Sequence, residues 1–482
     1  MEKIGHTLRT MSKEDREYIL HAVKNGKIDN IELWIARGGN VNYRELREQE
    51  STLLHLAVKV RQLEVIKTLI DFGARIDAFS SLDEQPLHLA CKDGMRAIAE
   101  ILIKNGANLE AKNRFGLAPI HLAIECNYIE IVMLLFNAGA NINAVASKRY
   151  NNLTPLQFAA EKGFAEIVKF LLQNGAMIDA SDAMGRTSLV WATIRNHQEV
   201  VEILIKGGAK LDICYPKTLQ SPLHFASGNG YTEIVNSLIR NGANINARDV
   251  TGRTPLFWAT SRNKLNVVQV LIKEGADMNI CGGSDMQSPI YLAVAKGFED
   301  VANTLITNGA DVNLRFGPYG LTPLFRALWN DNTCMVLNLL KHGAKMIKTS
   351  TNQTPLHIAA SKCAKEICQM LLDHGADVNA IDNKNAAPLH YALRLNKTEE
   401  DQEAFIDILI SNGANVNMKG TVHEFTPLHI SIGFKKLRII KILLKNGASL
   451  YRKNAYGKSP LEHALDKKFN DVFKMLLGAQ SI

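Results

Sequence analysis

The chain has 482 residues, of which 46% are hydrophobic, and a formal net charge of +8 from 56 Lys and Arg against 48 Asp and Glu. This composition fits a folded globular protein and excludes disordered and collagen-like chains. No apolar run approaches the ~20 residues that cross a bilayer, and the start, Met1 to His6, lacks the apolar segment of a signal peptide. The seven cysteines are scattered without a Cys-x-x-Cys pair, so we expect reduced thiols and a cytoplasmic location, with the nucleus and a host cell left open.

A Thr/Ser-Pro-Leu-His phrase, or a close variant, returns about every 33 residues along the chain. Two degenerate copies carry Leu53 and Ser188 in the place of the proline. The prolines of the other copies are Pro86, Pro119, Pro155, Pro222, Pro255, Pro289, Pro323, Pro355, Pro388, Pro427 and Pro460.

A Gly-Ala-x-hydrophobic-Asn/Asp run follows each phrase. In most copies its glycine lies 20 residues after the proline, as Gly106 does after Pro86, whereas the stretch from glycine to the next proline varies from 12 to 16 residues. A part of constant length indicates packed helices, and a part of variable length indicates a solvent-facing loop.

The copy that begins at Thr254 shows what each unit is. Thr254 is a good N-cap residue, and Pro255 takes the first helical position, where a missing N–H costs nothing. A polar break at 262–264 separates this helix from a second apolar one, and Gly275 then occupies a helix C-cap position. Each unit is therefore predicted to be a helix, a turn, a helix and a hairpin-like segment.

In chain order, we predict a tail over residues 1–12 and a single repeat array over 13–482. The array consists of an N-terminal capping repeat, 13–42, which lacks the Thr-Pro-Leu-His start, of internal repeats over 43–458, and of a C-terminal capping repeat, 459–482.

One copy is longer than the rest, with 25 residues from Pro388 to Gly413. We expect its extra polar residues, near Asn396 to Asp401, to lie in the loop between its two helices.

The phrase Thr-Pro-Leu-His, the closing Asn-Gly-Ala-Asn/Asp-Val-Asn and the 33-residue period resemble the ankyrin repeat family. The likeness covers nearly the whole chain, in about fourteen repeats. It implies an all-α fold, a curved superhelical solenoid of stacked helix pairs with projecting β-hairpin-like loops. It also implies that the motif histidine is structural and bonds backbone near the hairpins.

Patterns that would indicate an enzyme are absent from the sequence. There is no phosphate loop, nucleophile elbow, His-Glu-x-x-His or zinc-finger spacing. The motif histidines recur once per repeat, roughly 10 Å apart at ordinary helix spacing, which is too far for one metal ion to bridge. We therefore predict no enzyme activity, no cofactor and no metal. Trp191 and Trp258 are expected in the core.

Large aromatic and basic residues recur at the predicted hairpin tips, where stacking does not require them. Exposed aromatic and arginine side chains are typical anchors of protein interfaces, although some of them could instead fold back onto neighbouring hairpins. The candidate partner-binding residues are Arg114, Phe115, Arg149, Tyr150, Tyr215, Arg315, Phe316, Tyr319, Tyr451 and Tyr456.

The C-terminal end is the second candidate. From Gly433 onward the chain has 11 basic and three acidic residues, which accounts for all of the net charge. This end is either a solubilising cap or a docking patch for an acidic protein, with anionic lipid and nucleic acid less favoured. The patch residues are Lys435, Lys436, Arg438, Lys441, Lys445, Arg452, Lys453 and Lys458.

The sequence therefore predicts a non-enzymatic, monomeric scaffold that binds a partner protein on the concave face of its hairpins and inner helices. Two alternatives remain. One is an adaptor or host-directed effector that recruits substrates to a ubiquitin-ligase or signalling complex. The other is a regulator that docks acidic protein, anionic lipid or nucleic acid through its basic end.

Overall fold

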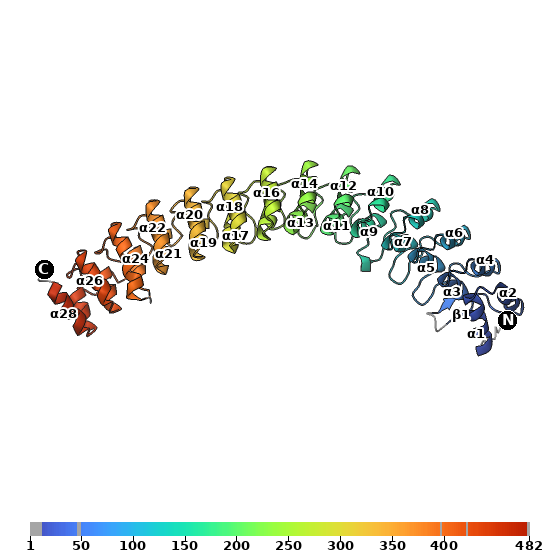
Figure 1. The fold of residues 1–482 in the computed structure, drawn as a ribbon, viewed down its shortest axis with the longest axis horizontal. Helices are drawn as coiled ribbons and strands as arrows, with labels where there is room; N and C mark the ends of the chain where they lie inside the picture. Colours follow the sequence, from blue (N-terminus) through green and yellow to red (C-terminus); the bar gives the residue numbers. More distant parts are fainter. Residues whose placement is uncertain (1–11, 46–49, 396–397, 421–422, 480–482) are drawn as a thin grey trace, which may run out of the picture. The chain divides into compact units, whose positions relative to one another are not determined.

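The computed structural model describes residues 12–45, 50–395, 398–420 and 423–479. Contacts divide the chain into two compact units, Met1–Ala226 with Tyr231–Asn244, and Ser227–Gly230 with Ile245–Ile482. Within each unit, helix pairs follow one another in chain order, with odd-numbered helices on one side and even-numbered helices on the other (Figure 1). This architecture confirms the predicted all-α repeat solenoid.

The pairs contain 28 α-helices in the described residues. The first fourteen are α1 Lys13–Lys24, α2 Ile28–Ala36, α3 Leu53–Lys59, α4 Leu63–Asp71, α5 Pro86–Lys92, α6 Arg96–Lys104, α7 Pro119–Glu125, α8 Ile129–Asn137, α9 Pro155–Lys162, α10 Ala165–Gln173, α11 Ser188–Ile194, α12 Gln198–Lys206, α13 Pro222–Asn229 and α14 Thr232–Arg240. The others are α15 Pro255–Ser261, α16 Leu265–Lys273, α17 Pro289–Lys296, α18 Glu299–Thr307, α19 Pro323–Trp329, α20 Thr333–Lys341, α21 Pro355–Lys362, α22 Lys365–Asp373, α23 Pro388–Leu393, α24 Glu399–Ser411, α25 Pro427–Gly433, α26 Leu437–Lys445, α27 Pro460–Asp466 and α28 Asn470–Gly478.

The helix ends follow the sequence signals. The motif residue is the first of its helix in all thirteen copies, including the degenerate Leu53 and Ser188. At the other end of the pair, Gly242 has φ +92°, and its N–H and that of Ala243 bond back to Ile239 and Leu238 at 2.9 and 3.0 Å. A residue with a Cβ is strained at this φ, which is why glycine closes the pair.

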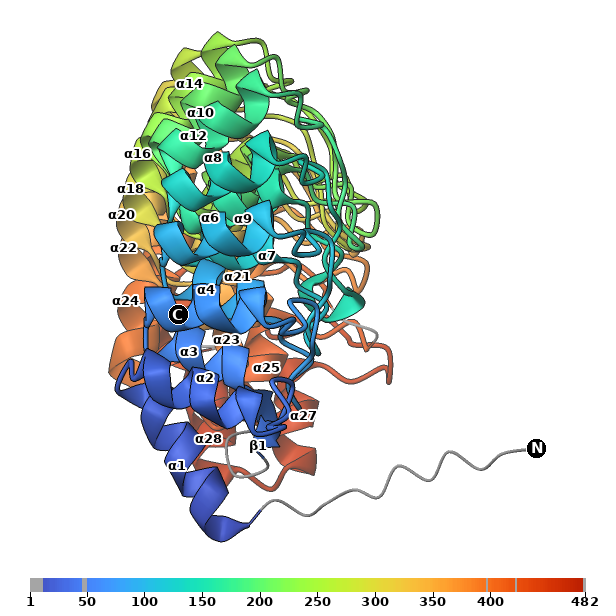
Figure 2. The same ribbon diagram turned by 90° about the vertical axis from the view of Figure 1, so that its right-hand side faces the viewer.

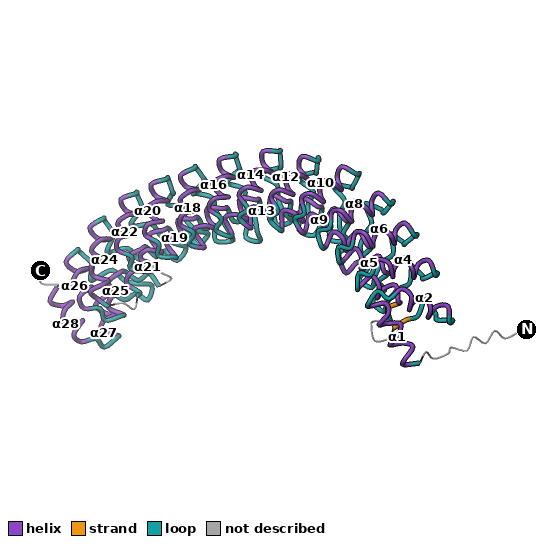
Figure 3. The backbone as a smooth tube through the Cα atoms, turned by 45° about the vertical axis from the view of Figure 1, so that its right-hand side comes forward, coloured by secondary structure: helices purple, strands orange, loops and turns teal. Residues whose placement is uncertain are grey.

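Loops of variable length connect one pair to the next, and within each unit they all project from the same side of the helices (Figures 2 and 3). Regular strand pairing is slight in the described residues. β1 (Arg44–Glu45) pairs antiparallel with β2 (Ser51–Thr52), and four other loops close with one isolated bridge each, such as Tyr215 to Gln220. A short 3₁₀ helix, Lys148–Tyr150, fills a longer loop.

The long copy differs from the prediction. Residues 396–397 lie outside the described residues, but Glu399, Glu400 and Asp401 are not in a loop: they form the first turn of α24, which has 13 residues where the other even-numbered helices have nine. Thr398 caps this turn through its Oγ1, which accepts from the Asp401 N–H at 3.3 Å. Three acidic residues at a helix N-terminus stabilise it further, so the extra residues lengthen the helix.

In the copies that carry it, the motif histidine ties its helix to the next hairpin. In His121, Nδ1 accepts from the Ala118 backbone N–H at 3.3 Å. A backbone N–H can only donate, so Nδ1 carries no proton, and the proton on Nε2 is donated to the Ala144 carbonyl at 3.0 Å. His88, His357 and His390 make the same two contacts, which confirms the structural role.

Six copies lack the histidine, and in one of them Gln157 performs the same task. Its Oε1 accepts from the Thr154 N–H at 2.8 Å, and its Nε2 donates to the carbonyls of Ala180 and Arg186 at 2.7 and 3.1 Å. Both His121 and Gln157 are fully buried. The contact therefore needs an acceptor and a donor and does not need an imidazole. The fold itself does not depend on it in every repeat, since Val190, Phe257 and Phe325 hold this position in other copies.

We expect His121→Gln to make the first unit less sensitive to acid. Burial lowers the pKa of His121 from 6.5 to about 4. Between these values the unfolded chain binds more protons than the folded one, so stability is lost as the pH falls through this window. The variant should reduce the slope of the unfolding free energy against pH by up to ~1.4 kcal/mol per pH unit.

Urea denaturation at a series of pH values measures this slope. At pH 8, where the histidine is neutral in both states, stability should match the parent within ~1 kcal/mol, because glutamine reproduces both hydrogen bonds. An unchanged slope would refute the assigned protonation state.

Candidate protein-binding surface

The residue directly after the motif histidine position varies in chemistry from copy to copy. The residue after that is Ala in twelve of the thirteen copies, the exception being Ser431. The varied residues, called here the inner ridge, are Leu56, Leu89, Leu122, Phe158, Trp191, Phe225, Trp258, Leu292, Arg326, Ile358, Tyr391, Ile430 and His463. The alanine position is buried between neighbouring helices, where only a small side chain fits. The inner ridge is half-buried in six copies, where the side chain can differ without disturbing the stack, and buried in the other seven.

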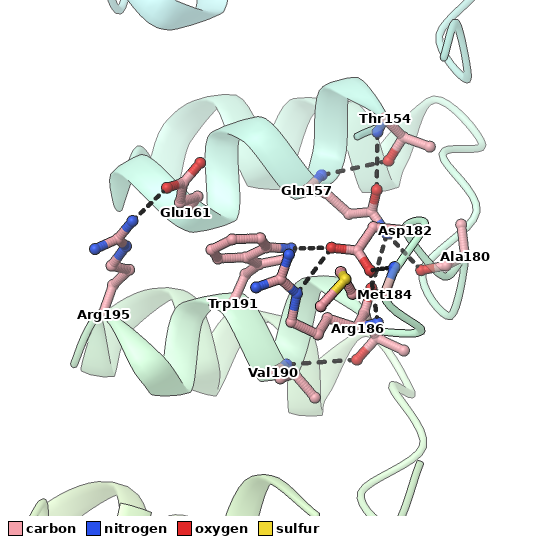
Figure 4. A network of polar contacts seen from close by, with 11 residues as sticks. Thr154, Gln157, Glu161, Ala180, Asp182, Met184, Arg186, Val190, Trp191 and Arg195 are labelled. Carbon is pink, nitrogen blue, oxygen red and sulfur yellow. Dashed lines mark hydrogen bonds and ion pairs between the residues drawn. The ribbon is translucent and has the colours of Figure 1, made fainter. Parts of the chain in front are cut away.

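Some ridge residues are tied to the hairpin before them. Figure 4 shows Asp182 at the centre of such a network. One carboxylate oxygen accepts from the backbone N–H groups of Met184 and Arg186, both at 2.8 Å, and so shapes the hairpin tip. The other accepts from the Trp191 indole N–H at 3.2 Å and from the Arg186 Nε at 2.9 Å. The Arg186 guanidinium lies 3.9 Å from the Trp191 ring centre.

The same spacing of nine residues recurs twice in the second unit. Trp258 donates to Asp249 at 3.0 Å, and the Tyr391 hydroxyl donates to Asp382 at 2.6 Å. Burial alone would raise the pKa of Asp249, but hydrogen bonds from Thr251, Arg253 and Trp258 outweigh it and lower the pKa. Burial and the neighbouring Asp382 raise the pKa of Tyr391 to about 12.

These networks refine the prediction for the tryptophans. Trp191 is buried as expected, but Trp258 is half-buried, with Arg253 and Arg262 at 5.6 and 5.0 Å from its ring. The spacing Asp-x8-Trp/Tyr is the sequence signal that could have revealed the pairing. Where the tip residue is the neutral Asn113, the residue nine positions later is Leu122, which has no donor.

We expect Tyr391→Phe to lower the unfolding free energy of the second unit by ~1–3 kcal/mol, because Asp382 loses a donor and Gln353, whose Nε2 donates to the hydroxyl at 2.7 Å, loses an acceptor. Urea denaturation measures the change. Tyr319→Phe is the matched control: this tyrosine is 59% exposed, and its hydroxyl makes no hydrogen bond within the described ranges. It should change stability by less than ~0.5 kcal/mol; equal effects would contradict the network.

The predicted tip residues divide into exposed and packed side chains. Tyr319, Tyr451 and Tyr456 are 59, 70 and 61% exposed. Arg114, Arg149 and Arg315 are also exposed, although the Arg315 Nη2 donates to the Lys348 carbonyl at 3.0 Å. Phe115, Tyr150 and Tyr215 are half-buried: Arg149 stands 5.0 Å from the Phe115 ring centre, and Tyr150 packs on Phe158 at 5.7 Å.

Phe316 was wrongly predicted as an exposed anchor. It is 4% exposed, and its ring packs on Tyr291 with centroids 4.7 Å apart. The bridge between Phe316 and Leu321 turns this hairpin so that the ring points toward the helices, while Tyr319 remains at the tip. A partner cannot reach Phe316 in this conformation.

Lys436 was wrongly assigned to the basic patch. It is 7% exposed, and its ammonium donates to the carbonyls of Leu393 and Leu395 at 2.9 and 2.8 Å and to the Gln402 side chain at 2.7 Å. Burial lowers the pKa of this lysine. Its role is to donate hydrogen bonds to carbonyls at the end of α23. These carbonyls need a side-chain donor because a longer connection replaces the regular turn that follows the other odd-numbered helices.

Lys436→Met should lower the stability of the second unit by ~1–3 kcal/mol, because the apolar stem is kept while three buried acceptors lose their donor. Lys441→Met is the control, since Lys441 is exposed on α26 and forms no ion pair among the described residues. Thermal unfolding of the two variants would measure the difference, and equal melting temperatures would contradict the buried role.

The remaining patch residues lie on different faces. Lys435 pairs with Asp471 at 2.9 Å, Arg438 with Glu400 at 2.9 Å, and Lys458 with Asp466. Lys441, Lys445, Arg452 and Lys453 are exposed and form no ion pair in the part of the chain that the structure describes. Lys441 and Lys445 lie on the helix α26, whereas Arg452 and Lys453 lie on the last hairpin.

The last two hairpins bring aromatic and basic residues together. The Tyr456 ring stacks on His423 with centroids 5.2 Å apart, and its hydroxyl lies 2.8 Å from the His423 Nδ1. Phe425 lies beneath them, 6.4 Å from Tyr456 and 5.6 Å from His463. We call these four residues, with Tyr451, Arg452 and Lys453, the C-terminal tip surface.

His423, Phe425 and His463 were not singled out from the sequence. The signal was available, because His423 precedes Tyr456 by 33 residues, one repeat period, and neighbouring hairpins place such residues side by side.

No three His, Cys, Asp or Glu side chains among the described residues gather closely enough to hold a metal ion. Likewise, no helix within the described ranges has the length and apolar character needed to cross a membrane.

Comparison with known families gives matches along most of the chain. The family described as "Ankyrin repeats (3 copies)" matches residues 77–146, 120–215, 211–281, 324–420 and 398–482, and "Ankyrin repeat" matches residues 49–80 and 285–315.

Similar curated proteins share short stretches only. The B-cell lymphoma 3 protein homolog of Mus musculus is 32% identical over 122 residues, which are 25% of this chain and 26% of that protein. The tyrosine-protein kinase Shark of Drosophila melanogaster is 31% identical over 155 residues, 32% of this chain and 16% of the kinase. The crystal structure of the ankyrin repeat domain of Bcl-3 is 28% identical, with a TM-score of 0.42, over 46% of this chain and 98% of that domain.

Proposed function

The chain belongs to the ankyrin repeat family, and from this premise we propose that it is a non-enzymatic scaffold that binds a partner protein on its hairpin tips and inner ridge. Ankyrin repeats generally mediate protein–protein interaction. The observation that carries the proposal is the contrast between a nearly invariant alanine position and the varied ridge position beside it. Stacking explains the first, and recognition of a particular partner explains the second.

The exposed tip residues support binding of the partner on this same face. Tyr319, Tyr451 and Tyr456 expose more than half of their surface, and tyrosine supplies large contact area at low entropic cost. A substrate-recruiting adaptor would use this face in the same way, since recruitment requires only that a protein be held. None of the seven cysteines, all of which lie in the described ranges, forms a disulfide, which supports an intracellular site of action.

Site-specific cross-linking tests the proposed face. A photoreactive amino acid would replace Tyr319 or Tyr451 at the tips and, as controls, Lys273 or Lys341, which are exposed on the even-numbered helices α16 and α20. In extracts of the native cell, we expect the tip positions to yield a discrete cross-linked protein at several times the yield of the helix positions. Cross-links concentrated at Lys273 and Lys341 would place the partner on the opposite face.

A further inference from the structure

We propose that the C-terminal tip surface binds an acidic segment of the partner protein that also carries an aromatic side chain. This inference rests on the proposed function and names the chemistry of the partner. It depends on two features of the same hairpins, a preformed layer of aromatic rings and two exposed basic side chains that form no ion pair among the described residues.

The ring layer is held in place before any partner arrives. His423 stacks on Tyr456 at an interplanar angle of 27° and lies within hydrogen-bond distance of its hydroxyl. Phe425 supports both rings from below and is itself in contact with His429 and His463. Although Tyr456 is fixed on one side, 61% of it faces solvent. A fixed and exposed ring loses little conformational entropy on binding, which favours it as an anchor for another aromatic group.

The charge beside the rings is positive. The segment 448–459 contains Arg452, Lys453 and Lys458 and no acidic residue. Lys458 is neutralised by Asp466. The Glu462 carboxylate accepts from the Ser459 N–H and hydroxyl at 2.7 and 2.8 Å, and these hydrogen bonds lower its pKa, with a smaller contribution from the nearby Lys453.

Arg452 and Lys453 are therefore exposed cations directly beside the aromatic layer, with no ion pair within the described ranges. A carboxylate from a partner would find its first counter-ions here, and Arg452 can bind it through two parallel N–H groups.

The extent of the charge favours a peptide segment over a nucleic acid. The preceding hairpin, 414–426, carries Lys419 and Glu424, which pair with each other at 2.8 Å. Of the last two hairpins, only the second therefore carries basic side chains that form no ion pair in the described part of the chain. A single strand of nucleic acid is held by a basic groove that follows several successive phosphates, whereas a short acidic segment needs one basic site and one anchor.

The experiment is binding of synthetic fluorescent peptides to the full chain, followed by anisotropy at low salt. The probe is a short peptide rich in Glu and Asp with one central Trp. We expect saturable binding that weakens about tenfold when Trp is replaced by Ala, and about tenfold with Tyr456→Ala or with Arg452→Glu plus Lys453→Glu. Tyr456→Phe should retain most of the affinity, since it keeps the ring.

Matched variants control for charge and for folding. Lys441→Glu plus Lys445→Glu makes the same charge change on α26 and should alter affinity less than about twofold. Circular dichroism would establish that each variant is folded. Equal weakening by the two charge pairs would overturn the proposal in favour of unspecific attraction, and absence of binding at millimolar peptide would overturn it outright.

A single-stranded oligonucleotide is the third arm. Tighter binding of the oligonucleotide than of the peptide, lost with Arg452→Glu plus Lys453→Glu, would assign the surface to nucleic acid. Tip cross-links to a partner in the experiment above, together with failure of the peptide here, would leave the scaffold function standing and remove only this inference.

Discussion

In eight of the thirteen motif copies, one side chain links helix and loop: the histidine or glutamine at the third position of the helix. It accepts from the backbone of its own N-cap and donates to a carbonyl of the following hairpin, in a site from which water is excluded. A buried polar group left without a partner is costly, so in these copies the hairpin must bring its carbonyl back to this side chain whatever the length of the loop. The hairpin asparagines act at the start of the loop, where the Asn379 side chain bonds Gly413 and Asn415 of the next repeat at 2.9 and 2.7 Å.

Because contacts at their ends hold the hairpins to the helices, folding places little constraint on the residues at the hairpin tips. Some tips are nevertheless tied down. Asp182 is joined to Trp191 and Asp382 to Tyr391, so the aromatic residues of these copies serve the loop as well as the surface. Other tips keep most of a side chain in solvent, as Tyr319 does. The array therefore combines a uniform interior with a face on which each repeat differs, which is the arrangement that recognition of a protein surface requires.

Charge along the chain is a poor guide to charge on a surface. The C-terminal excess of lysine and arginine is shared among three roles. Lys436 points inward as a donor to helix carbonyls, Lys435, Arg438 and Lys458 pair with acidic neighbours, and only the remainder contributes an open positive surface. The aromatic residues near Arg452 give that remainder a specific place on the last hairpin.

The sequence by itself determined the repeat and the bounds of most helices, because each depends on residues a few positions apart: an N-cap with proline after it and a glycine at the C-cap. The role of the motif histidine followed from the resemblance to the ankyrin repeat family, since its second partner lies in the next hairpin. Tertiary structure decided what depends on residues about one repeat apart or on the turn of a loop. Only in the folded chain does Phe316 pack on Tyr291 and become buried, does Lys436 donate to the Leu393 carbonyl, and does Tyr456 stack on His423. The sequence could not show these contacts, because the identity of a lysine or a phenylalanine does not reveal whether residues distant in the sequence bury it or leave it exposed to solvent.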